Sequence, residues 1–115
     1  MQIELYIDGE KKVFTAPFVP MLAKRKYLEI EAKNEEKMSK AKEKGEEYIP
    51  TPKEQLDEEN ELLGILCDIV FKKQFTIDQL VNGASDKYVY SKLREAVFGI
   101  PAEEDEVDRG NEMGK

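Results

Sequence analysis

The stretch that decides the fold is QIELYIDGEKKVFTAPFVPMLAKRKYLEIE, which occupies residues 2–31. Its first six residues alternate apolar with polar side chains, which is the period of a half-buried strand. Asp8 and Gly9 follow, and these two residue types accept the positive φ angles of a tight turn. Because β-favourable residues then resume, the sequence predicts a β-hairpin over residues 2–15.

A helix is expected after the hairpin, over about residues 20–44. Pro20 suits the first helical position because its φ is fixed and it has no N–H to satisfy. The first turns carry apolar side chains on two nearly opposite sides, whereas a surface helix usually has one apolar stripe. This helix therefore needs two neighbours: the hairpin and a later helix, or a partner protein in place of one of them. Residues 33–44 are mostly charged, and we interpret them as a solvated face or a mobile arm.

Three further helices are predicted, over about residues 52–73, 76–82 and 85–98. The first starts with Thr-Pro-Lys-Glu at residues 51–54, which is a capping box with proline at the first helical position. Its apolar side chains cover about half of its circumference, so this helix is expected at the centre of the core. The next helix has Thr76 as its N-cap, and Gly83 is expected to end it in the left-handed conformation. Ser85 or Asp86 caps the last helix.

Three residues near the end of the helix at 52–73 are expected in the core. Cys67 lies on the apolar side of that helix, so a buried structural thiol is predicted rather than a reactive one. Phe71 and Phe75 follow, and we expect them to close the core against the last helix; an exposed docking pair is the alternative. A single cysteine also excludes an intramolecular disulfide and fits a reducing compartment.

Residues 102–115 carry six acidic and two basic side chains and almost no apolar ones. Segments of this composition bury too little apolar surface to fold, so a flexible acidic tail is predicted. Residues 1–101 are predicted to form a single domain, because a chain of 115 residues rarely holds two cores. The fold class is α+β and mainly α: an N-terminal β-hairpin, three to four helices and a disordered acidic C-terminal tail.

Composition argues against most catalytic and metal chemistry. Histidine is absent, which removes the usual general base and the commonest transition-metal ligand. No phosphate-binding loop, nucleophile elbow, Cys-x-x-Cys pair or EF-hand spacing occurs, and the acids at 103–108 lack the glycine-centred spacing of a calcium loop. We therefore expect a protein that is not an enzyme, with no catalytic, cofactor-binding or metal-binding residues and no cofactor.

Contact with membranes or nucleic acid is not expected either. No apolar run approaches the roughly 18 residues that cross a bilayer, and the first residues show a strand pattern rather than a secretory signal, which indicates a cytoplasmic protein. Lys11, Lys12 and residues 24–26 are the only basic concentration in a chain of net charge −7. Binding to phosphates needs a wider positive face, and nearby acids balance these side chains.

Residues 3–32, with Tyr-Ile-Asp-Gly at 6–9 and Thr-Ala-Pro-Phe-Val-Pro at 15–20, resemble the start of phage tail assembly chaperones. These belong to long-tailed, siphovirus-type phages or prophages of low-GC Gram-positive bacteria. The helix at 86–99 and the acidic end are similar too, and the resemblance covers about residues 1–101. It implies a protein of the host cytoplasm that binds the tape-measure protein, keeps it soluble and helps recruit tail-tube subunits. In many of these phages a programmed frameshift adds a longer product, and the final Gly-Lys dipeptide is compatible with one.

A client with exposed apolar helices needs a partner that offers apolar grooves or helix faces. The side chains predicted to contact a partner or a second copy are Met21, Leu22, Tyr27, Leu28 and Ile30. The alternative function is a small regulatory or nucleic-acid-associated adaptor protein of a phage or mobile element. Such a protein would bind duplex DNA in a salt-dependent manner.

Overall fold

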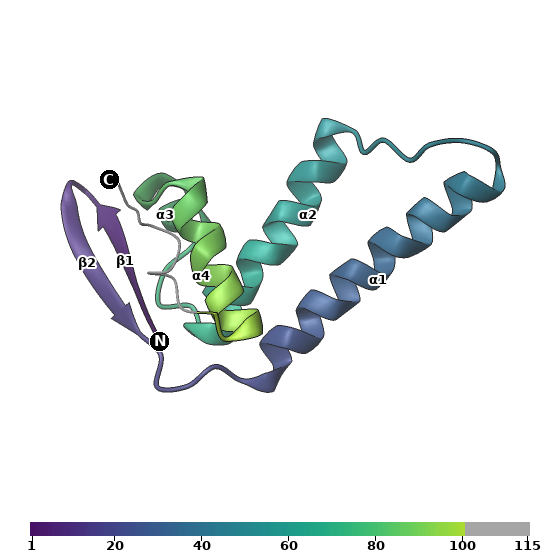
Figure 1. The fold of residues 1–115 in the computed structure, drawn as a ribbon. Coiled ribbons are helices and arrows are strands. Elements are labelled where there is room, and N and C mark those ends of the chain that lie inside the picture. The colour runs from purple at the N-terminus through teal and green to yellow at the C-terminus, as the bar shows by residue number, and fades with distance from the viewer. Residues whose placement is uncertain (101–115) are drawn as a thin grey trace, which may run out of the picture.

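The computed structural model describes residues 1–100, which form a two-stranded hairpin followed by helices (Figure 1). The elements are β1 (Gln2–Ile7), β2 (Glu10–Thr15), α1 (Met21–Glu43), α2 (Pro52–Gly64), the π-helix η1 (Ile65–Val70), α3 (Ile77–Gly83) and α4 (Asp86–Phe98). The predicted hairpin and the mainly helical fold are confirmed. The acidic tail predicted at 102–115 lies outside the described residues.

The predicted hairpin turn is present. Asp8 and Gly9 have φ angles of 54° and 81°, as a two-residue turn between twisted strands requires. The strands pair antiparallel, so that Ile3 faces Phe14 across the sheet. Ile3 and Leu5 point to the same face and are fully buried. An isolated two-stranded hairpin is marginally stable, so this buried face holds the hairpin on the helices.

The hairpin packs on α3 at Gly83, and the role of this glycine differs from the predicted one. Gly83 does not have a positive φ, and Ala84 ends the helix in an extended conformation, so the expected left-handed stop is wrong. A Cβ atom at Gly83 would lie 2.8 Å from the carbonyl oxygen of Tyr6 and 3.1 Å from its nitrogen. Glycine is needed here because the helix and β1 approach each other closely.

The predicted capping box at Thr51 and the predicted N-cap at Thr76 are both present. Thr51 Oγ1 accepts a hydrogen bond from the Glu54 N–H at 3.1 Å, and Glu54 Oε1 accepts one from the Thr51 N–H at 2.9 Å. Thr76 and Gln79 form the same arrangement at the start of α3. Ser85 is the N-cap of α4. Local sequence thus fixes where these helices begin.

The core is centred on η1, which corresponds to the second half of the helix predicted at 52–73. Its buried side chains are Ile65, Leu66, Cys67 and Val70. The backbone changes from α to π geometry here, because the Phe71 N–H bonds to the oxygen five residues earlier at 2.9 Å. Side chains from α1 and α4 pack on this segment. The first half of the predicted helix is not central, since Leu56 is 61% exposed.

Three predicted core residues are buried as expected. Phe71 and Phe75 pack on each other with ring centroids 5.3 Å apart, and Phe75 also contacts Phe14 of the hairpin at 5.0 Å. They close the core, and the alternative of an exposed docking pair is wrong. Cys67 is a buried free thiol. Burial, followed by the charge of Asp68, raises its pKa to about 12, so the reactive thiolate is absent near neutral pH.

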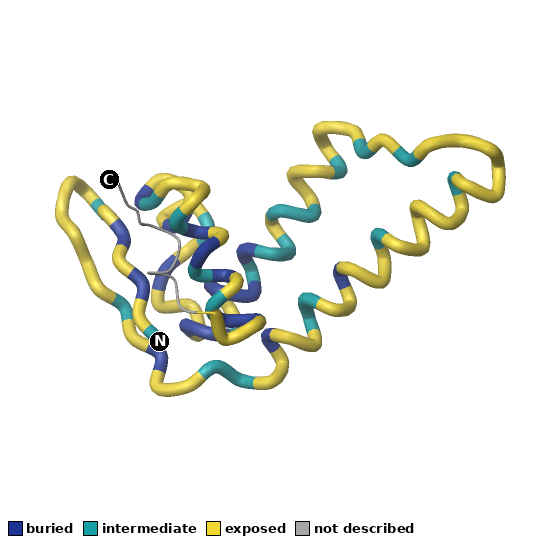
Figure 2. The backbone as a smooth tube through the Cα atoms, viewed as in Figure 1, coloured by how far each residue is buried: buried dark blue, intermediate teal, exposed yellow. Residues whose placement is uncertain are grey.

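The second half of α1 and the first half of α2 leave the core as a helical arm (Figure 1). Residues 44–51 connect the two helices at its tip. Most of the arm is exposed, as the yellow backbone in Figure 2 shows. Lys33 on α1 donates to Glu61 on α2 at 2.8 Å, which joins the two helices near the base of the arm. The charged stretch at 33–44 is thus a solvated continuation of α1.

Adding a methyl group at Gly83 tests the close approach to β1. We expect Gly83→Ala to lower the free energy of unfolding by about 1–3 kcal/mol, because the new Cβ overlaps the Tyr6 backbone. Gly64→Ala is the matched control: Gly64 is helical, and its nearest neighbour atom would be 3.8 Å away. The control is expected to be neutral or to stabilise by up to about 1 kcal/mol. Urea unfolding measures both, and equal effects would contradict the packing argument.

Candidate partner-binding surface

Exposed apolar side chains form the candidate functional surface. Large apolar residues with substantial exposure include Phe18, Met21, Leu22, Leu28, Ile49, Leu56 and Phe98. Within residues 1–100, no group of three acidic, histidine or cysteine side chains is placed to hold a metal ion. No helix of the described chain is long and apolar enough to cross a membrane.

Four of these residues lie at the start of α1, and we call Phe18, Met21, Leu22 and Leu28 the α1 patch. Met21 and Leu28 are two helical turns apart and therefore share one face. They are 78% and 52% exposed, and Leu22 beside them is 54% exposed. Phe18 precedes the helix in the connection from β2 and is also exposed. Several exposed apolar side chains at one end of a helix make this region the candidate interaction surface.

The structure divides the five predicted contact residues between surface and core. Met21, Leu22 and Leu28 are exposed, whereas Tyr27 is half-buried and Ile30 is only 1% exposed. The two apolar sides of the predicted helix are both present. One packs on η1 and on the later helix α4, and the other, which carries Met21 and Leu28, is largely exposed. The side chain of Ile30 is therefore not accessible to a partner in this conformation.

A groove lies between α1, α2 and α4, with a volume of about 230 Å³. Its apolar lining includes Leu62, Leu93 and Val97. Tyr27 of α1 meets Phe98 of α4 edge-on, with ring centroids 5.3 Å apart. We call this the α1–α4 groove. It offers a small apolar depression on the side of α1 next to the α1 patch.

The chain matches the phage tail chaperone protein family over residues 1–115. It belongs to this family. No curated protein and no solved structure gives a significant match to the chain. A phage tail chaperone is a non-enzymatic protein that serves tail assembly, so tail proteins are its partners. This confirms the predicted family and favours it over the nucleic-acid-associated adaptor.

Two tyrosines bring polar groups to the groove of this tail chaperone. The Tyr90 hydroxyl donates to Glu59 Oε2 at 3.1 Å. Burial, followed by this hydrogen bond and the Glu59 charge, raises the pKa of Tyr90 to about 12. The pKa of Tyr27 is raised by burial and then by the Glu31 charge. Both phenols therefore keep their protons near neutral pH, and each has a nearby carboxylate, Glu31 for Tyr27 and Glu59 for Tyr90.

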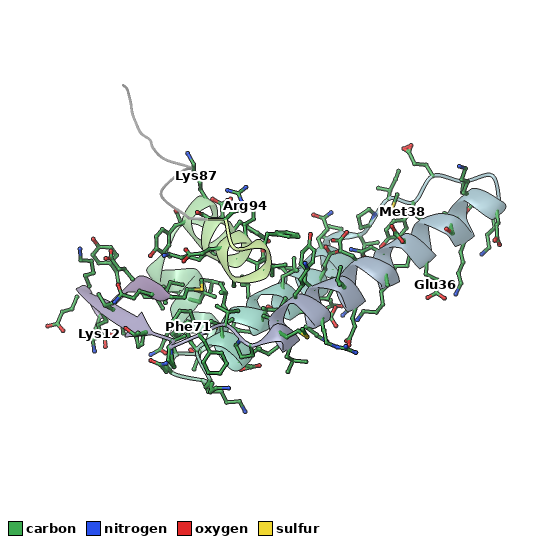
Figure 3. The ribbon with its side chains drawn as sticks, turned by 60° about the horizontal axis from the view of Figure 1, so that its bottom comes forward. Lys12, Glu36, Met38, Phe71, Lys87 and Arg94 are labelled. Carbon is green, nitrogen blue, oxygen red and sulfur yellow. The ribbon has the colours of Figure 1, made fainter. Side chains whose placement is uncertain are left out.

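The tail chaperone has a larger hollow on the arm, with a volume of about 460 Å³. It is lined by Met38 of α1, by Tyr48 and Pro50 of the connection, and by charged residues such as Lys42 and Glu58. Figure 3 shows Met38 on the side of α1 toward the connection and Glu36 on the opposite side. Its charged lining makes it less suited to an apolar helix than the α1–α4 groove.

Sequence reasoning missed two aromatic residues of these surfaces. Phe18 lies between Pro17 and Pro20, outside the predicted strands and helices. Periodicity therefore could not assign its side chain to a buried or an exposed face. Phe98 is the last residue of α4, next to the buried Val97, and it was assigned to the helix without a role. In both cases a bulky aromatic side chain at the edge of an element was the available signal, because such residues are frequent at protein interfaces.

The polar rim of the groove can be tested by titrating Tyr90. Because its pKa is raised in the fold, the neutral phenol favours the folded state below its ordinary value of 10.0, and this contribution is lost as the pH rises through about 12. We expect Glu59→Gln to lower the pKa of Tyr90, with burial still holding it above the ordinary value. The tyrosine carbon NMR signal that is lost in Tyr90→Phe reports the titration. An unchanged pKa in Glu59→Gln would contradict the hydrogen bond.

Proposed function

We propose that this tail chaperone binds the tape-measure protein of a long-tailed phage of a Gram-positive host. It keeps this client soluble in the cytoplasm of the bacterium and helps bring tail-tube subunits to it. The proposal is supported by the family of the chain and by the resemblance of residues 3–32 to the chaperones of such phages. A longer frameshifted product that shares residues 1–115 belongs to the same proposal.

The exposure of Met21, Leu22 and Leu28 is the observation that carries the proposal. A long helical client has apolar stripes that must be covered before it assembles, and a helix face with exposed apolar side chains covers them. The opposite face of α1 is anchored through Ala23 and Ile30, which are buried. The α1 patch is therefore held on a fixed helix, and little conformational entropy is lost when a client binds.

Charge around the α1 patch keeps the complex dispersed. Lys24, Arg25 and Lys26 lie within the same turns of α1, and the whole chain has a net charge of −7. Glu29 pairs with Lys26 at 4.0 Å, so the apolar patch is bordered by charges of both signs on a molecule that is acidic overall. A net charge well away from zero disfavours association between complexes, which suits a protein that must cover a client without precipitating with it.

The double substitution Met21→Ser and Leu28→Ser tests the α1 patch. Both side chains are exposed, so we expect the circular dichroism spectrum and thermal midpoint to stay close to wild type. Binding to the tape-measure protein should weaken by about 10- to 100-fold, because two apolar contacts are lost. The measurement is the amount of soluble tape-measure protein that co-purifies after co-expression. Wild-type recovery with a folded variant would contradict the proposal.

Two comparisons make this result specific. Ile49→Ser with Leu56→Ser removes two apolar side chains that are 74% and 61% exposed on the arm, and it should leave co-purification unchanged. Sedimentation of the chaperone alone shows whether the α1 patch binds a second copy. Self-association that disappears in the Met21→Ser, Leu28→Ser variant would assign the patch to contact between copies.

A further inference from the structure

The hydrogen-bond pattern of the hairpin shows which backbone groups each outer edge presents. Met1 and Ala16 exchange two hydrogen bonds, of 2.9 and 2.8 Å. In an antiparallel pair, positions bonded in this way alternate with positions whose N–H and C=O point outward. In the observed register, the outward groups therefore belong to residues 2, 4 and 6 on β1 and to residues 11, 13 and 15 on β2.

The edge of β1 is covered by the helices. The N–H of Glu4 donates to the Tyr88 hydroxyl at 3.0 Å. The end of α3 lies against Tyr6, where Gly83 leaves no room for a side chain. The sheet has no space for another strand on this side.

The edge of β2 is open over most of its length. The carbonyl oxygen of Thr15 accepts from Gln74 Nε2 at 2.9 Å, which occupies the last position. In the described chain, the outward N–H and C=O groups of Lys11 and Val13 have no hydrogen-bond partner, and both residues are exposed. An unpaired strand edge is a template on which another extended chain forms hydrogen bonds.

The open edge is also cationic. Lys11 and Lys12 lie on β2 and outnumber its one acid, Glu10. Lys72 and Lys73 lie on the loop whose Gln74 side chain is hydrogen-bonded to the end of β2. Within residues 1–100, Lys12, Lys72 and Lys73 form no ion pair, and Lys11 approaches only Glu4, at 3.8 Å. Figure 3 shows Lys12 on the hairpin, at the end of the molecule away from the arm. A bound segment with acidic side chains would neutralise these charges.

We propose that the open edge of β2 binds an extended, acidic segment of a partner protein, which joins the hairpin as a third strand. The backbone groups of Lys11 and Val13 provide hydrogen bonds, and the lysines select acidic side chains. This site is separate from the α1 patch and does not depend on it. A second copy of the chain is a poor occupant, because pairing two β2 edges brings lysines of both copies together and like charges across strands are destabilising.

Amide hydrogen exchange followed by NMR on the full chain tests the site. The probe is the peptide acetyl-Thr-Glu-Val-Glu-Val-Glu-Thr-amide, and the control peptide has lysine in place of glutamate. In the free protein we expect fast exchange at Lys11 and Val13 and slow exchange at the ladder positions Lys12 and Phe14. Millimolar acidic peptide should slow Lys11 and Val13 by about tenfold. The lysine peptide should have no effect, and added salt should weaken the acidic one.

Val13→Pro removes one outward donor without removing a ladder hydrogen bond, because the Val13 N–H points away from β1. We expect it to lose binding of the acidic peptide, whereas Val13→Thr, which keeps the N–H, should retain it. Exchange at Lys12 and Phe14 shows whether the hairpin remains intact. If Val13→Pro disrupts it, Lys12→Glu leaves the backbone unchanged and should weaken binding of the acidic peptide, because one of the four lysines at the edge is replaced by an acid.

Three results would overturn the proposal. The first is no protection of Lys11 and Val13 at millimolar acidic peptide, or equal protection by both peptides. The second is protection in the protein alone that grows with protein concentration, which would assign the edge to a second copy. The third is protection in the protein alone that is lost when residues 102–115 are removed, which would assign it to the chain's own acidic segment.

Discussion

The burial of η1 between α1, α4 and the rest of the core is the interaction on which the structure depends. Ile65, Leu66, Cys67 and Val70 are all buried on one turn and a half of helix. Each such aliphatic side chain contributes roughly 1.5–3 kcal/mol when it leaves water. The two-stranded hairpin has two fully buried side chains, Ile3 and Leu5, and the short α3 buries only Leu80 and Gly83. They fold because η1 and the phenylalanines that follow it give them a surface to pack on.

The same packing explains why the functional surface is where it is. Once Ala23 and Ile30 have anchored one side of α1 to the core, the other side must face solvent, and it carries Met21 and Leu28. Exposed apolar side chains such as these add little to the stability of an isolated monomer, because they contact water in both the folded and the unfolded chain. Their presence is accounted for if a partner covers them. One face of α1 therefore packs in the core, and the opposite face is available to a partner.

Local signals in the sequence predicted most of the helices and strands. The features that were not predicted depend on packing between segments far apart in the chain. The Asp8-Gly9 turn and the caps at Thr51 and Thr76 depend on neighbouring residues alone, so pattern reading located them. The change to π geometry and the need for Gly83 depend on segments far apart in the chain. The candidate site shows the same division. Periodicity found two apolar faces on α1, but it assigned Ile30 and Leu28 to the same role, because only the packed core shows which face is inside.

The buried state of Cys67 has a practical consequence for spectroscopy. It is the single cysteine of the chain, and its high pKa and enclosure keep it out of reach of thiol reagents. A cysteine introduced at an exposed position such as Ile49 would then be the one site that accepts a fluorophore or spin label. The native protein is thus a ready background for measuring distances from the arm to a bound client.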